Sequence, residues 1–147
     1  MRRSASHLLT NEAMQLAGTA ILLIEDAPDI RDAFTVLLRT EGAEVTPAGS
    51  GREAAECLAR QRYDIVLTDL GLPDIPGDVL IRQIVTTASS RPRVVAVTGY
   101  GEPERGRARA AGADAVLAKP VEWSELLEEL RPPPRTSESA RPHRVAA

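Results

Sequence analysis

The sequence predicts an α/β domain in which a five-stranded parallel sheet is doubly wound, with helices on both faces. Short apolar runs alternate with longer amphipathic segments from residue 20 onward, which is typical of repeated βα units. Polar side chains follow four of these runs directly. The 147 residues, of which 43% are hydrophobic, suffice for one domain. We therefore expect a single core, at residues 20–130.

Five short runs rich in leucine or β-branched residues predict buried strands. They are residues 20–25, 44–48, 64–69, 93–98 and 115–118. The amphipathic segments predict helices at about residues 28–41, 51–61, 77–88, 102–111 and 122–130. Right-handed crossovers between parallel strands would distribute these helices over both faces of the sheet.

The first predicted helix has recognisable ends. Pro28 suits a first helical turn, and Gly42 stands where a glycine commonly ends a helix. On the same helix, Phe34 and Leu37 are expected to face the core.

Both ends of the chain differ from the predicted domain. Residues 1–19 lack clean periodicity and are expected to form a flexible extension, with a short helix at about residues 12–17. Residues 131–147 contain four prolines with scattered arginine and serine, a composition that predicts a disordered tail. A signal peptide is disfavoured because polar residues interrupt the approach to the first apolar run. No run approaches the roughly 20 apolar residues of a membrane-spanning helix.

Charge and cysteine content exclude several classes of partner. Eighteen basic residues against 21 acidic ones give a net charge of −3, without the basic excess that nucleic-acid binding requires. Cys57 is the only cysteine, so neither an internal disulfide nor a thiolate metal cage can form. We expect Cys57 on a helix surface or in the core, and the protein in the cytoplasm, away from membranes.

Polar residues stand at the predicted strand ends. They are Glu25 and Asp26 after the first strand, Asp69 at the end of the third, Thr98 at the end of the fourth and Lys119 after the fifth. In a doubly wound sheet the carboxyl ends of the strands converge on one crevice. Three carboxylates in one pocket repel each other unless a cation compensates. Mg²⁺ suits this site because it needs few protein oxygens and leaves room for a phosphoryl group.

Phosphoryl transfer to an aspartate is the chemistry that such a site favours. The Asp69 carboxylate can act as the nucleophile, while Thr98 and Lys119 supply donors to the phosphoryl oxygens. Lys119 is the only lysine among the 18 basic residues, which indicates that the site itself requires a compact ammonium.

Residues 21–130 resemble the receiver domains of bacterial response regulators. Four segments carry the resemblance: ILLIED at residues 21–26, DIVLTDLGLP at 64–73 followed by Gly77, VTGYG at 97–101 and ADAVLAKP at 113–120. The resemblance implies a flavodoxin-like (βα)5 fold with strand order 2-1-3-4-5. It also implies a phosphoryl group received from a sensor histidine kinase or a histidine phosphotransfer protein, and slow self-catalysed hydrolysis.

The resemblance assigns roles to individual residues. Asp69 is the implied phosphoacceptor, and Glu25, Asp26, Asp69 and the backbone carbonyl of Gly71 are the implied magnesium ligands. Thr98 and Lys119 are the implied contacts to the phosphoryl group, and Pro120 resembles the cis proline of the family.

Three positions depart from or refine the family pattern. Val116 stands where a rotating Tyr or Phe is usual, which puts aromatic switching in doubt. Gly99 replaces the more usual alanine after the threonine, as in receivers of hybrid kinases. Tyr100 lies two residues past Thr98, and we expect it to shield the aspartyl phosphate.

Competing interpretations remain for single residues. Asp26 and Asp69, taken one at a time, could be helix caps. The arginines at 105, 107 and 109 are expected to form a solvated helix face; the alternative is a partner surface with Trp123 as its anchor.

Several functions fit a receiver domain. The leading hypothesis is a stand-alone response regulator that contacts an output protein which the sequence does not identify. The alternatives are a phosphate shuttle or sink in a hybrid-kinase relay, and a scaffold that is independent of phosphorylation. An aspartyl-phosphate phosphatase is disfavoured because Gly71 stands where those enzymes carry a second aspartate as general acid. We therefore expect no enzymatic turnover of external substrates.

Overall fold

The computed structural model describes residues 14–87 and 89–131. Most of the predicted extension and the predicted tail therefore lie outside the described residues. Where the domain ends on either side stays a prediction.

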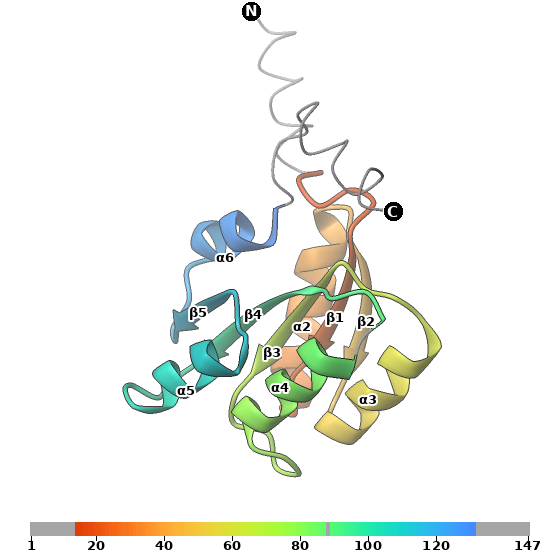
Figure 1. Cartoon of the computed structure of the whole chain (residues 1–147). Helices are drawn as coiled ribbons and strands as arrows, with labels where there is room; N and C mark the ends of the chain where they lie inside the picture. The colour runs from red at the N-terminus through yellow and green to blue at the C-terminus, as the bar shows by residue number, and fades with distance from the viewer. Residues whose placement is uncertain (1–13, 88, 132–147) are drawn as a thin grey trace, which may run out of the picture.

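Five parallel strands form one sheet at the centre of the molecule (Figure 1). They are β1 (Ala20–Ile24), β2 (Glu44–Ala48), β3 (Ile65–Asp69), β4 (Arg93–Thr98) and β5 (Ala115–Ala118). Their order across the sheet is β2-β1-β3-β4-β5, which confirms the predicted fold class and strand order. Ile24 pairs with Thr68, and Thr98 pairs with Ala118, so the carboxyl ends of the strands lie level with one another.

In the described part of the chain, five helices connect or follow the strands. They are α2 (Pro28–Thr40), α3 (Gly51–Arg60), α4 (Gly77–Thr87), α5 (Glu104–Ala111) and α6 (Trp123–Leu130). Their bounds differ from the predicted ones by one or two residues, as helix ends commonly do. Pro28 occupies the first turn of α2 as predicted. Gly42 follows that helix with a φ of 95°, a left-handed conformation that favours glycine.

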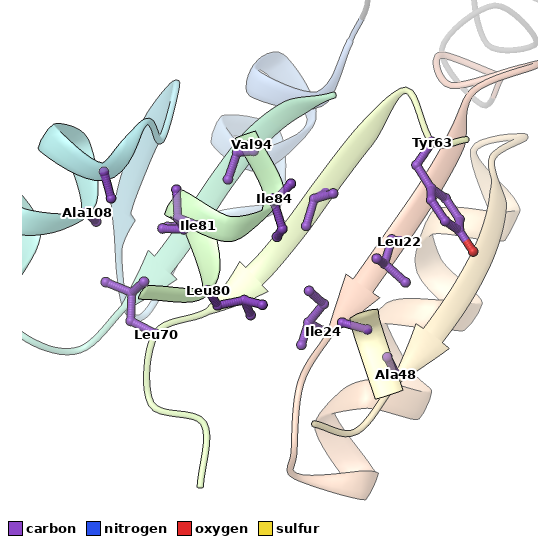
Figure 2. Packing of buried hydrophobic residues seen from close by; sticks show 14 residues of the cluster. Leu22, Ile24, Ala48, Tyr63, Leu70, Leu80, Ile81, Ile84, Val94 and Ala108 are labelled. Atoms are coloured by element: carbon purple, nitrogen blue, oxygen red, sulfur yellow. The ribbon is translucent and has the colours of Figure 1, made fainter. Parts of the chain in front are cut away.

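The two faces of the sheet bury separate apolar clusters. Helices α3, α4 and α5 cover one face and α2 and α6 the other, as Figure 1 shows. In Figure 2, Ile81 and Ile84 of α4 point toward the sheet, where Leu22, Ile24 and Val94 belong to the same buried cluster. Ile21 and Leu23 alternate with these positions and face α2 and α6, among the residues of the second cluster. Burial on both faces accounts for the continuous apolar character of the strands.

The face of α2 that packs on the sheet differs from the predicted one. Leu38 is fully buried and Phe34 is half-buried, whereas Leu37 is 45% exposed, so the prediction of a core role for Leu37 was wrong. Adjacent helix positions point about 100° apart, and Leu38 occupies the inward direction instead. Phe34 stacks on Trp123 of α6 with ring centroids 6.3 Å apart. Trp123 is therefore half-buried at the α2–α6 contact and not an exposed anchor.

Two of the described residues before β1, Leu16 and Thr19, are buried. Residues 14–18 form turns, so the short helix predicted at about residues 12–17 is wrong for residues 14–17, while residues 12 and 13 lie outside the described residues. Leu16 is fully buried against the α2–α6 face, and its N–H donates to the carbonyl of Glu41 at 2.8 Å. The lack of helical periodicity at residues 14–18 agrees with a turn in which Leu16 is the buried apolar side chain. Within the described ranges, no helix has both the length and the apolar character needed to cross a membrane.

Candidate functional site

The candidate site lies at the carboxyl edge of the sheet, where the sequence predicted it. Glu25 and Asp26 follow β1, Asp69 ends β3 and Thr98 ends β4. Lys119 follows β5, and its N–H donates to the Thr98 carbonyl at 2.8 Å. The parallel register brings these positions together because all four strands end at the same edge.

Three carboxylates form the acidic part of the site. One oxygen from each of Glu25, Asp26 and Asp69 lies within 4.8 Å of the others. Glu25 is 6% exposed, the side chain of Asp69 is 12% exposed, and Asp26 is open to solvent. A set of hard oxygen donors with one open side matches the ligand preference of Mg²⁺, which retains several waters.

Both oxygens of the Asp69 carboxylate have partners. The Lys119 ammonium lies 3.1 Å from Oδ2, and the Gly71 N–H donates to Oδ1 at 3.0 Å. Lys119 follows the edge strand β5 and lies 50 residues after Asp69 in the sequence. Its side chain is partly exposed, so it can reorient toward a group bound to Asp69.

The electrostatics of the site act most strongly on Glu25. Burial raises the pKa of its carboxyl above the ordinary value of 4.5, and the negative charge of Asp69 raises it further. The Ala27 N–H, which donates to Oε2 at 3.0 Å, and the Lys119 charge act in the opposite direction. A cation between Glu25 and Asp69 would relieve the cost of ionising both.

Burial and one hydrogen bond restrict the orientation of the Thr98 side chain. It is buried, and its Oγ1 accepts a hydrogen bond from the Tyr100 N–H at 2.9 Å. This bond does not use the hydroxyl hydrogen, which can therefore donate to another oxygen. The structure thus brings all the predicted site residues to one edge, while the roles assigned to them stay predictions.

Two residues that shape the site were missed by sequence reasoning. Arg31 of α2 donates from Nη1 to the carbonyl of Glu25 at 2.9 Å, which holds the backbone of the acidic pair. Asp74 accepts hydrogen bonds from the backbone of α3, 22 and 23 residues earlier in the chain. Neither position carries a sequence signal, because an arginine in a helix and an aspartate in a loop are common on any surface.

The region around Val116 also differs from expectation. Arg105 is half-buried and donates from Nη2 to the Val116 carbonyl at 3.3 Å, so it does not belong to a solvated face. Arg107 and Arg109 are exposed as predicted. The bond between Lys119 and Pro120 is cis, as the resemblance implied.

Comparison with known proteins identifies the family. The response regulator receiver domain model matches residues 21–131. The chain belongs to this family. The response regulator protein PilR of Pseudomonas aeruginosa is 36% identical over 108 residues, which are 73% of this chain and 24% of that protein. An uncharacterized 14.6 kDa protein of Leptolyngbya boryana is 34% identical over 115 residues, 76% of this chain and 87% of that protein.

Solved structures agree with the fold. The receiver domain of the sensor histidine kinase PA1611 from Pseudomonas aeruginosa, solved with a magnesium ion in its active site cleft, is 34% identical. It superposes with a TM-score of 0.70 over 78% of this chain and 95% of that one. The match spans about a quarter of the length of PilR, so the similarity concerns that part of PilR alone.

The raised pKa of Glu25 predicts a pH-dependent cost to stability in metal-free protein. A group whose pKa is higher in the folded state adds stability below its ordinary value, here 4.5, and loses that contribution as pH rises through the raised value. We expect the melting temperature of wild type in EDTA to fall more steeply above pH 4.5 than that of Glu25→Gln. Differential scanning calorimetry between about pH 4 and pH 8 measures both slopes. Glu128→Gln, at an exposed position on α6, controls for net charge, and parallel curves for wild type and Glu25→Gln would contradict the expectation.

Proposed function

We propose that this protein is a response regulator that receives a phosphoryl group on Asp69. The donor is a sensor histidine kinase or a histidine phosphotransfer protein, and the phosphorylated form signals through contacts with an output protein. The observation that carries this proposal is the arrangement of Asp69, with two further carboxylates within 4.8 Å and the Lys119 ammonium at 3.1 Å.

Magnesium is the proposed cofactor. Glu25, Asp26 and Asp69 would hold it through carboxylate oxygens, and Gly71 through its backbone carbonyl. The residues fit because the three carboxylates are close together and one of them is buried with a raised pKa. When bound, Mg²⁺ supplies positive charge that stabilises the phosphoryl oxygens. The magnesium ion in the cleft of the PA1611 receiver supports the assignment.

The protein's own residues account for the transfer step. An oxygen of Asp69 attacks the phosphorus of the phosphohistidine, a P–O bond forms, and the P–N bond breaks with its electron pair going to the imidazole. Lys119 then exchanges its contact with Asp69 for one with a phosphoryl oxygen, and Thr98 donates its hydroxyl hydrogen to another. Attack of water on the phosphorus later restores the carboxylate and releases phosphate.

Other functional assignments follow from the same site. We propose that the protein does not turn over external substrates, because Gly71 offers no general acid two residues after Asp69. We further propose that it acts in the cytoplasm, without binding membranes or nucleic acid, which agrees with a net charge of −3.

Phosphorylation by a small-molecule donor tests the proposal. Incubation with acetyl phosphate and Mg²⁺ should add one phosphoryl group, detected by intact mass, and the adduct should be lost in Asp69→Asn or in EDTA. Asp64→Asn is the matched control, because Asp64 precedes β3 at the opposite end and its carboxylate accepts the Ala20 N–H. This variant should still be phosphorylated. An adduct that persists in Asp69→Asn would contradict the assignment of the acceptor.

Tyr100 is expected to protect the phosphoryl group from water. The residue is 55% exposed, yet its hydroxyl and Asp69 Oδ1 each lie 3.8 Å from the point where a Cβ on Gly71 would stand. Tyr100→Ala should therefore shorten the lifetime of the aspartyl phosphate several-fold, measured by the decay of the mass adduct after removal of the donor. Tyr100→Phe should keep the wild-type lifetime if the ring provides the shield. A Tyr100→Ala adduct that decays no faster would show that the ring does not cover the group.

A further inference from the structure

The start of helix α3 is capped from outside the helix. The Gly51 N–H donates to Asp74 Oδ1 at 3.0 Å, and the Arg52 N–H donates to Asp74 Oδ2 at 2.9 Å. The third amide of the helix, that of Glu53, donates to Ser50 Oγ at 3.1 Å. Ser50 is an ordinary local cap, whereas Asp74 belongs to the loop between β3 and α4. One carboxylate therefore ties this loop to a separate helix.

Close packing at the start of α3 leaves no space for a side chain at position 51. Gly51 is buried, and a Cβ placed on it would collide with Cγ2 of Ile75. At the other end of the loop, a Cβ on Gly77 would lie 2.7 Å from Leu70 Cδ2 and 2.8 Å from its Cα. Asp74 and Ile75 thus hold the loop against α3. At Gly77 the chain packs closely against Leu70, which precedes the loop.

This loop carries part of the candidate site. Gly71 lies three residues before Asp74, and its N–H donates to Asp69 Oδ1. In the proposed function, its carbonyl is also a magnesium ligand. A glycine on an exposed loop has many accessible conformations, so an anchor nearby is needed to keep both groups in position.

We propose that Asp74 is a positioning residue, which fixes the loop between β3 and α4 on the start of α3 and thereby holds Gly71 in place for the metal and the phosphoacceptor. The metal part of this inference rests on the proposed function. The backbone N–H groups of Arg52 and Gly51 lower the pKa of Asp74 below its ordinary value of 3.8, so at neutral pH the carboxylate is ionised and can accept both bonds.

The competing explanation is that Asp74 only stabilises α3. Ser50→Ala separates the two explanations, because it removes a cap from the same helix end without touching the loop. Asp74→Ala removes both loop-to-helix bonds, and Asp74→Asn retains an oxygen acceptor for one of them. All three variants keep the proposed metal ligands.

The first readout is the backbone order parameter of the Gly71 amide, measured by ¹⁵N relaxation in the metal-free protein. We expect a value of about 0.85 in wild type and Ser50→Ala, and below about 0.6 in Asp74→Ala. Asp74→Asn should fall in between, and it replaces Asp74→Ala if that variant does not fold. Equal order in wild type and the Asp74 variants, or equal loosening in Ser50→Ala, would overturn the proposal.

The second readout is Mg²⁺ affinity by isothermal titration calorimetry. Asp74→Ala should bind Mg²⁺ about tenfold more weakly than wild type, because loss of a residue that supports a metal ligand typically lowers affinity by about tenfold or more. Ser50→Ala should bind Mg²⁺ as wild type does. Unchanged affinity in Asp74→Ala would overturn the metal-positioning role. Failure of wild type to bind Mg²⁺ would instead contradict the proposed function, and the order parameter would still decide whether Asp74 holds the loop.

Discussion

Three carboxylates repel one another at the carboxyl edge of the sheet, and this repulsion governs what the site can hold. Glu25 is buried beside Asp69, and neither burial nor proximity favours the charged form of Glu25. The fold imposes this arrangement because parallel strands end level with one another. Lys119 offsets part of the charge through its contact with Asp69. The remaining negative charge favours a bound cation at this edge.

The strands and the residues at their ends could be predicted from the sequence because both leave local signals. Burial on both faces produces continuous apolar runs, and the crevice at the sheet edge produces polar residues directly after them. This logic located Asp69, Thr98 and Lys119 before any contact was known. The sequence pattern is less precise about which side of a helix faces the core. Leu37 was predicted to be buried, but Leu38, the next residue, takes the inward position.

Side-chain contacts between separate segments could not be predicted because they join residues with no shared pattern. Asp74 reaches α3 and Arg31 holds the carbonyl of Glu25, yet each looks like an ordinary surface charge in the sequence. Arg105 was misassigned for a similar reason, since its contact with Val116 depends on how α5 packs beside β5. The candidate site residues thus stand at strand ends, whereas the contacts that fix their surroundings join segments far apart in the sequence.

An NMR titration of the ¹⁵N-labelled protein with Mg²⁺ tests the central claim most directly. We expect saturable binding at one site, with the largest amide shifts at Asp26, Ala27 and residues 69–71 and small shifts elsewhere in the described chain. Asp26→Asn should weaken the binding, because this substitution removes one of the three carboxylates. Shifts that do not saturate, or that spread evenly over exposed acidic residues, would contradict the claim that these strand ends form a cation-dependent phosphoacceptor site.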